Sequence, residues 1–261
     1  MSHAQCDFDY SGSRVLVTGG SNGIGREIAA HFKRSGAEVL ITGTRADAGD
    51  YDHDLSGFEY HSLQLTDAES VEKLAAGLGS LDILINNAGA NLPGGRNEWE
   101  PDIFEEVVTI NLTSAFRLAV ACKPLLAQSA LEAGGCVVNL ASMSSFFAVP
   151  VVPGYGAAKA GIVQMTKNLA VTWAAEGIRV NAVAPGLIES NMTAAMKGIE
   201  VLEKPQIGRT PMGRWGVPED IAPAVLFLAS SAVGHISDRH YPHRYVYCHK
   251  HHPTTIANAQ L

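Results

Sequence analysis

The stretch Arg14-Val-Leu-Val-Thr18-Gly19-Gly-Ser-Asn-Gly23-Ile-Gly25 decides the fold of this chain. A short run rich in β-branched residues leads directly into glycines, and a helical pattern follows. Gly19 allows a sharp turn, Gly23 lets the backbone approach a pyrophosphate, and Gly25 lets the helix pack closely on the strand. Such a loop alone is often only a flexible turn. Between a first strand and a helix, it predicts a dinucleotide site at the helix N-terminus.

Apolar runs and helical patterns alternate over the first two-thirds of the chain. Nearly continuous apolar runs are typical of parallel strands that helices cover on both faces. We expect strands at 14–18, 39–42, 81–85, 136–140 and 178–183, and a weaker one at 58–63. We expect helices at 24–35, 68–78, 101–126, 155–175 and 219–229. This alternation predicts an α/β fold, a doubly wound parallel β-sheet of Rossmann type that binds ligands at the carboxyl ends of its strands.

Composition limits the possible partners. The 261 residues are 46% hydrophobic and 17% charged, as in a globular domain with a large core. The net charge of −7 argues against nucleic acid or an anionic membrane surface. No apolar run reaches about 18 residues, and the polar N-terminus lacks a signal-peptide core, so we expect a cytoplasmic protein. The cysteines match neither a metal site nor a disulfide framework; they are Cys6, Cys122, Cys136 and Cys248.

Tyr155 and Lys159 suggest acid–base chemistry, and Ser142 lies upstream of them. Residues at i and i+4 share one helix face, so the ammonium can approach the phenol. A cation about 4 Å away would favour the phenolate by roughly 4 kcal/mol at an effective dielectric of about 20. We therefore expect Lys159 to bring the pKa of Tyr155 toward neutrality, which makes the phenol a usable acid or base. The alternative is that the two side chains are only helix neighbours.

Ordered motifs connect these features. They are Thr18-Gly-x-x-x-Gly-Ile-Gly25, Asn86-Asn-Ala-Gly89, Asn111, Ser142, Tyr155 with Lys159, and Pro185-Gly186. In this order they resemble the short-chain dehydrogenase/reductase family, over about residues 12–236. Three segments are most similar to 3-oxoacyl-acyl-carrier-protein reductases, namely 18–40, 185–193 and 218–222.

The resemblance implies four catalytic residues. Tyr155 would donate a proton to a carbonyl oxygen during reduction or remove one from an alcohol. Ser142 would hydrogen-bond that oxygen, and Lys159 would lower the tyrosine pKa and bind the nicotinamide ribose. Asn111 would relay protons through a water to Lys159. Two alternatives stay open: Asn111 as an internal polar residue that kinks its helix, and Ser142 as a strand-end cap.

The end of the second strand bears on cofactor choice. An acidic residue there would bind the ribose 2′-hydroxyl and select NAD, but this chain has Gly43-Thr44-Arg45. A hydroxyl and a guanidinium suit a 2′-phosphate, so we expect NADP(H), with NAD(H) as the alternative if Arg45 is only a solvated charge. Segment 46–57 is too short and polar for the full helix usual at this place. The implied cofactor site comprises Gly19, Ser21, Asn22, Gly23, Ile24, Thr44, Arg45, Gln64, Leu65, Asn87, Ala88, Gly89, Tyr155, Lys159, Pro185, Gly186, Ile188 and Ser190.

The substrate is less well defined. An apolar loop at 146–153 and an expected lid at 192–211 suit a substrate with a hydrophobic arm, although these residues could equally pack on the sheet. The resemblance implies an NADP(H)-dependent oxidoreductase that interconverts a ketone and a secondary alcohol, and an acyl thioester (3-oxoacyl type) is one candidate substrate.

The C-terminus departs from the family pattern. An apolar last strand with an Asp-Gly-Gly turn is expected after Ser230, but the chain continues with His235-Ile-Ser-Asp-Arg-His240. We therefore expect one catalytic domain over 1–236, a last strand altered or missing, and an atypical His-rich tail over 237–261. Segment 245–248 is a candidate substitute strand. The tail histidines match no metal site, so no metal is expected.

This departure bears on assembly and on activity. The resemblance implies a homodimer or homotetramer. The family's last strand helps to form the tetramer interface, and this chain departs from the family at that strand. The alternative function is a family-derived dinucleotide-binding protein with impaired or no turnover.

Overall fold

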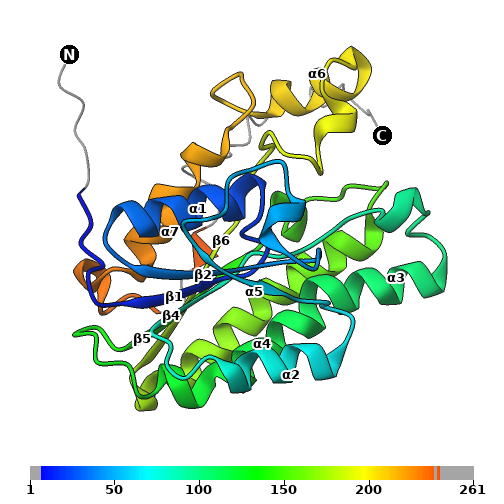
Figure 1. Ribbon diagram of the computed structural model, residues 1–261. Coiled ribbons are helices and arrows are strands. Elements are labelled where there is room, and N and C mark those ends of the chain that lie inside the picture. The colour runs from blue at the N-terminus through cyan, green and yellow to red at the C-terminus, as the bar shows by residue number, and fades with distance from the viewer. Residues whose placement is uncertain (1–6, 238–239, 242–261) are drawn as a thin grey trace, which may run out of the picture.

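A parallel sheet runs through the computed structural model, which describes residues 7–237 and 240–241 (Figure 1). Its seven strands have the order β3-β2-β1-β4-β5-β6-β7, and every neighbouring pair is parallel. The strands are β1 (Arg14–Val17), β2 (Glu38–Gly43), β3 (Glu59–Ser62), β4 (Ile83–Asn86), β5 (Gly135–Leu140), β6 (Ile178–Val183) and β7 (His240–Tyr241). The order reverses beside β1, which is the switch point where such folds bind ligands.

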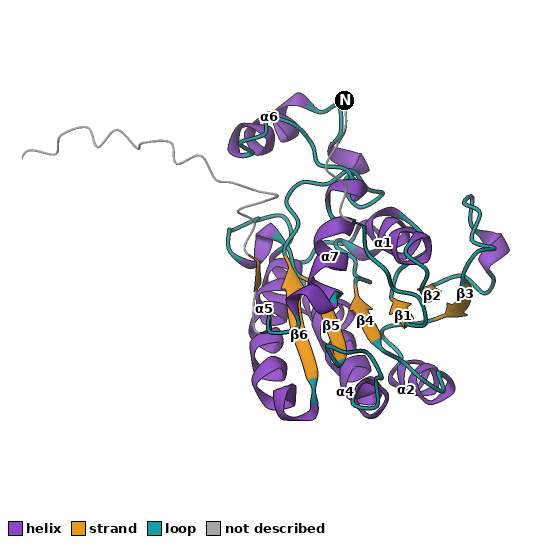
Figure 2. Cartoon of the chain, turned by 90° about the vertical axis from the view of Figure 1, so that its left-hand side faces the viewer, coloured by secondary structure: helices purple, strands orange, loops and turns teal. Residues whose placement is uncertain are grey.

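Helices cover both faces of this sheet. They are α1 (Gly23–Arg34), α2 (Ala68–Gly77), α3 (Pro101–Val108), α4 (Ser114–Leu126), α5 (Pro153–Trp173), α6 (Glu200–Arg209) and α7 (Ala222–Ala229). Figures 1 and 2 show α1 and α7 on one face and α2, α4 and α5 on the other. The predicted doubly wound α/β fold is therefore confirmed.

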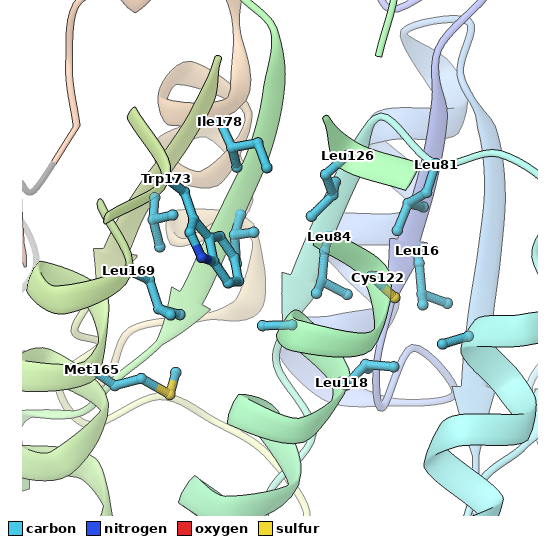
Figure 3. Packing of buried hydrophobic residues seen from close by; sticks show 14 of the residues in the cluster. Leu16, Leu81, Leu84, Leu118, Cys122, Leu126, Met165, Leu169, Trp173 and Ile178 are labelled. Carbon is cyan, nitrogen blue, oxygen red and sulfur yellow. The ribbon is translucent and has the colours of Figure 1, made fainter. Parts of the chain in front are cut away.

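Alternate residues of the strands build two cores. Leu16 packs in the cluster under α2, α4 and α5, whereas Val15 and Val17 belong to the cluster under α1 and α7. Figure 3 shows part of the first cluster, with Leu84 and Leu118 near Leu16. Full burial of one such side chain contributes roughly 1.5–3 kcal/mol. The continuous apolar runs of the sequence thus reflect strands that are covered on both faces.

The predicted elements agree with the structure except in two places. The expected helix 101–126 is interrupted, because residues Thr109–Thr113 form a π-helical turn between α3 and α4. The expected lid contains α6, which the sequence did not indicate as a helix because Pro205 lies inside it. In segment 46–57 only the short 3₁₀ turn Ala48–Asp50 is helical, as its polar composition predicted.

The last strand is altered but not missing. β7 is two residues long and pairs with Ala182 and Val183 at the end of β6. Side chains of β6 hold the chain that leads to it: Asn181 Nδ2 donates to the Ile236 carbonyl at 2.9 Å, and Arg179 donates to the Leu228 and Ala229 carbonyls. The candidate strand 245–248 and nearly all of the His-rich tail lie outside the described residues.

The structure also bears on the cysteines and on the expectation that no segment spans a membrane. Cys122 and Cys136 are buried free thiols, whereas Cys6 and Cys248 lie outside the described residues. Among the described helices, none has the length and apolar character needed to span a membrane. The cytoplasmic location stays a prediction.

Candidate active site

The glycine-rich turn joins β1 to α1 in a conformation that requires glycine. Gly19 and Gly23 have φ angles of 64° and 52°, which side chains rarely adopt. A Cβ added to Gly25 would overlap the Gly19 carbonyl oxygen, so helix and turn can pack this closely only without a side chain there. The backbone N–H groups at the start of α1 therefore open toward the carboxyl ends of the strands.

Thr18 ties the turn to the end of β4. Its Oγ1 accepts the backbone N–H groups of Asn87 and Ala88, each at 3.0 Å. The Asn87 side chain in turn donates to the Thr18 carbonyl at 2.9 Å. These bonds join the carboxyl ends of β1 and β4 at the switch point. They hold Asn87 and Ala88 in place against the glycine-rich turn.

A cleft of about 570 Å³ runs along these strand ends. It brings together most of the residues that the sequence singled out. Its lining includes Gly19, Ser21, Asn22, Gly23, Ile24, Thr44, Gln64, Leu65, Asn87, Ala88, Gly89, Ser142, Tyr155, Lys159, Pro185, Gly186, Ile188 and Ser190. Arg45 and Asn111 are absent from the lining and lie beside it. The roles given to individual residues stay predictions.

Ser142 follows β5, and its hydroxyl lies near enough to the Tyr155 hydroxyl to lower the pKa of the phenol. Its Oγ also accepts the Ser144 N–H at 3.2 Å, which caps the 3₁₀ turn Met143–Ser145. The expected alternative, a strand-end cap, is therefore real and coexists with the contact to the phenol. The cap fixes the serine at the point where the phenol reaches it.

Burial raises the pKa of Tyr155 to about 12, against the lowering effect of the Ser142 hydroxyl and with a further increase from the negative charge of Glu98. The expectation that the neighbouring lysine would bring this pKa toward neutrality is wrong for the protein by itself. Desolvation of the phenolate outweighs the attraction that was estimated from helix spacing alone.

Lys159 shows why that estimate failed. Its ammonium lies 5.5 Å from the centre of the Tyr155 ring, over the ring face, and donates to the Leu140 carbonyl at 2.7 Å. Only 4% of the residue is exposed, and burial lowers the pKa of the ammonium to about 8. The cation is thus held at the end of β5, and it contacts the ring face of Tyr155.

Asn111 lies in the π-helical turn between α3 and α4. Its Nδ2 donates to the Val107 carbonyl at 2.9 Å and to the Ala90 carbonyl at 2.7 Å. Its Oδ1 is buried and has no hydrogen-bond partner within the described chain. A Cβ on Gly89 would overlap Oδ1 and lie 3.5 Å from Lys159 Nζ. Asn111 therefore interrupts the helix, as the alternative held, and also presents a free acceptor close to Lys159.

Glu98 is a buried carboxylate that sequence reasoning missed. It is 0% exposed and accepts the backbone N–H groups of Tyr155 at 2.9 Å and Leu92 at 2.8 Å. The Tyr155 N–H belongs to the first turn of α5, so the carboxylate caps that helix and favours its positive end. Nothing in the polar stretch around Glu98 signals this role, because its partner N–H is far along the chain.

The other end of the cleft lies at the end of β2. Gln64 Nε2 donates to the Thr44 carbonyl at 2.9 Å. The Arg45 guanidinium lies 4.7 Å from the centre of the Tyr51 ring and stacks on it, while the residue stays exposed. Tyr51 also lines the cleft. Sequence reasoning missed it because it comes from the irregular segment 46–57.

Known proteins that are similar to this chain are dehydrogenases and reductases. A family model described as Enoyl-(Acyl carrier protein) reductase matches residues 19–240. A 3alpha-hydroxysteroid dehydrogenase of Mediterraneibacter gnavus is 35% identical over 85% of this chain and 92% of its own length. A 3-oxoacyl-[acyl-carrier-protein] reductase of Vibrio cholerae is 34% identical over 88% of this chain and 94% of its own length.

Solved structures agree with these relatives. The NADP active-site complex of Pseudomonas aeruginosa RhlG has a TM-score of 0.79 at 30% identity, over 90% of this chain and 96% of that protein. Sequence motifs, strand order and these likenesses lead to one conclusion. The chain belongs to the short-chain dehydrogenase/reductase family and is an NAD(P)-dependent oxidoreductase that acts on CH–OH groups.

Proposed function

We propose that the protein is an NADP(H)-dependent oxidoreductase that interconverts a ketone and a secondary alcohol. One observation carries the proposal: the Ser142 and Tyr155 hydroxyls lie near each other in the cleft that begins at the glycine-rich turn. The buried ammonium of Lys159 lies against the same tyrosine. A phenol, a hydroxyl and a cation beside a nucleotide-type turn suit carbonyl reduction better than hydrolysis, because a positioned proton donor is present.

The residues present fit a nicotinamide dinucleotide. Positive-φ glycines and the first N–H groups of α1 suit the pyrophosphate, and the unpartnered Asn111 Oδ1 near Lys159 suits a solvent-linked proton path. Tyr155 and Lys159 would hold the nicotinamide ribose, and the Ile188 backbone would hold the carboxamide. When bound, the nicotinamide supplies or accepts the hydride.

The protein's own groups handle the proton. With a pKa of about 12, Tyr155 is protonated at neutral pH and can donate to a carbonyl oxygen. Ser142 would hydrogen-bond the same oxygen and hold it beside the phenol. Lys159, with a pKa of about 8, can supply a replacement proton near neutral pH.

The preference for NADP(H) is supported by Thr44 and Arg45 at the end of β2 and by the NADP complex of the similar RhlG structure. The test is turnover of one ketone with NADPH and with NADH under matched conditions. A clear advantage for NADH would overturn this part of the proposal and leave the oxidoreductase itself standing.

The substrate end of the cleft is mixed in character. Met143, Val149 and Met192 give apolar walls. Ser144 Oγ and Gln206 Oε1 are buried atoms without a hydrogen-bond partner in the described residues. The similar proteins carry the names of steroid and 3-oxoacyl enzymes, and a 3-oxoacyl thioester is our candidate substrate. A panel of 3-oxoacyl thioesters, ketosteroids and keto-sugar acids, followed by nicotinamide absorbance, tests this choice.

A second function is favoured by the short β7, which is only two residues long. A protein that binds dinucleotide but turns over poorly would result if this edge fails to support the cleft. Tight nucleotide binding without hydride transfer across the whole panel would favour this second function. Turnover of any ketone on the panel would remove it.

Self-association also belongs to the proposal, as a homodimer or homotetramer. Large apolar side chains are exposed on two neighbouring helices, with Phe116 and Val120 on α4 and Val171 on α5. Covering these side chains would bury apolar area. Light scattering after size-exclusion chromatography tests the assembly, and a monomer at micromolar concentration would contradict it.

A further inference from the structure

The Tyr51 hydroxyl lies over the end of β2, at the adenosine end of the cleft. A Cβ added to Gly43, the last residue of β2, would overlap this hydroxyl. Dinucleotide-binding sheets read the 2′-position of the adenosine ribose at the end of this strand. The tyrosine therefore lies where a 2′-substituent would be recognised, and the missing side chain at Gly43 leaves room for it.

Donor groups converge on the phenol oxygen of Tyr51. The Arg45 backbone N–H donates to it at 3.1 Å, and the Ser21 and Thr44 side chains lie near it. The Tyr60 hydroxyl lies 3.4 Å away and donates to the Arg45 carbonyl at 2.6 Å. The Arg45 guanidinium stacks on the ring. Hydroxyl and N–H donors beside a guanidinium form a site that suits an anionic oxygen.

We propose that the Tyr51 hydroxyl occupies the 2′-phosphate subsite of the protein and has to be displaced when a 2′-phosphorylated dinucleotide binds. The inference rests on the proposed function, because it assumes that the cleft holds a dinucleotide. Ser21, Thr44 and the Arg45 N–H are the groups that would bind a 2′-phosphate, and the phenol now takes the hydrogen bond of the Arg45 N–H. Tyr51 thus acts as an internal competitor for the phosphate.

The competition is selective between cofactors. A ribose with a free 2′-hydroxyl brings no anion into the subsite and can hydrogen-bond the phenol in place. A 2′-phosphate needs the same donors as the phenol, so NADP(H) must displace the phenol from them. Tyr51 therefore lowers affinity for NADP(H) relative to NAD(H), and Arg45 and Thr44 act in the opposite direction.

The test is the variant Tyr51→Phe, which removes the hydroxyl and keeps the ring on which Arg45 stacks. Dissociation constants for NADPH and NADH are measured by nicotinamide fluorescence with the full chain, and those for 2′,5′-ADP and 5′-ADP by calorimetry. Loss of one competing hydrogen bond should tighten NADPH and 2′,5′-ADP roughly five-fold relative to NADH and 5′-ADP. Tyr60→Phe is the matched control, because that hydroxyl does not line the cleft; its NADPH/NADH ratio should stay within about two-fold.

Three other outcomes of these binding measurements would contradict the inference or the proposed function. A selective loss of NADPH affinity in Tyr51→Phe would make the phenol a phosphate ligand and overturn the inference. An unchanged NADPH/NADH ratio would overturn it as well. Failure of the wild-type protein to bind any of the four nucleotides would instead sink the proposed function, and the inference with it. Near-ultraviolet circular dichroism confirms that both variants are folded.

Discussion

The two ends of the cleft are built in different ways. At the catalytic end, Ser142, Tyr155 and Lys159 stand on β5 and α5 or directly beside them, and the lysine is almost fully buried. At the adenosine end, Thr44, Arg45 and Tyr51 stand on an irregular segment, and Thr44 and Arg45 are exposed. On the proposed function, regular elements position the groups that transfer the proton, whereas an irregular segment sets the choice between NADP(H) and NAD(H). We therefore expect the loss of a single side-chain atom at the catalytic end to lower the rate strongly. We expect a similar change at the adenosine end to alter cofactor affinity only slightly.

The largest expected effect is at the catalytic end. Tyr155→Phe removes the proton donor, and kcat should fall by about 10³ or more, since general acid catalysis contributes roughly 10²–10⁴. Nucleotide dissociation constants should rise by only about five-fold, because the variant loses one hydrogen bond to the ribose. Steady-state rates and fluorescence titration measure the two quantities. Retention of wild-type kcat would end the assignment of Tyr155 as the acid.

Lys159 gives the next largest effect, on stability as a function of pH. Its pKa is about 8 in the folded protein, against 10.5 as the ordinary value. Below pH 8 both states are protonated, and the cost of burying the cation is fully present. Between about pH 8 and 10.5 the unfolded chain binds more protons, so the free energy of unfolding rises with pH.

The total rise from this group is at most roughly 3 kcal/mol. Urea unfolding of wild type and Lys159→Met across this pH range isolates the contribution, since other titrating groups cancel in the difference. The wild-type curve should rise more steeply than that of the variant. Parallel curves would show that the ammonium is not desolvated.

Substitution of Glu98 tests whether this carboxylate, which belongs to no sequence motif, stabilises the catalytic end of the cleft. Glu98→Ala leaves the N–H groups of Leu92 and Tyr155 without their acceptor, which should destabilise the protein by roughly 2–4 kcal/mol. Differential scanning calorimetry measures this loss.

Glu98→Gln keeps the shape and removes the charge that raises the Tyr155 pKa. The ascending limb of the pH–rate profile for alcohol oxidation, on which Tyr155 must ionise, should therefore move to lower pH in this variant. A profile identical to that of wild type would restrict Glu98 to a purely structural role.

The smallest effect is at the adenosine end. Burial opposes ionisation of Tyr51, but its contact with the Tyr60 hydroxyl and the hydrogen bond from the Arg45 N–H lower its pKa to about 8, with further lowering from Ser21 and Thr44 nearby. The other charged groups of this corner are the Arg45 guanidinium, over the Tyr51 ring, and Asp47 and Asp50, near Tyr60. Tyrosinate absorbance should show one group that titrates near pH 8, absent in Tyr51→Phe. If 2′,5′-ADP takes the hydrogen bond of the Arg45 N–H from the phenol, the pKa of Tyr51 should rise when this nucleotide binds. An unchanged pKa would argue against displacement of the Tyr51 hydroxyl.

Much of the catalytic end could be predicted from the chain. The glycine turn, Asn86-Asn-Ala-Gly89 and the Tyr155/Lys159 pair are local patterns on elements whose periodicity is clear, and the cleft brings them together. The sign of the Tyr155 pKa shift could not be predicted, because it depends on burial and on Glu98, a carboxylate distant in sequence. The interruption of the helix at Asn111 was only an alternative at the level of sequence, because a side-chain bond to the Val107 carbonyl leaves no periodicity signal.

By itself, the sequence determined the strand–turn–helix start, the doubly wound sheet, and the serine, tyrosine and lysine of the site, because short-range spacing and apolar periodicity encode these features. Only the tertiary structure decided that Tyr51 lies over Gly43, that Glu98 caps α5, and that β7 pairs with β6 over two residues. These are contacts between segments distant in the chain, made by irregular loops. Their energies come from desolvation and from donors that converge in space, which no single stretch of residues records.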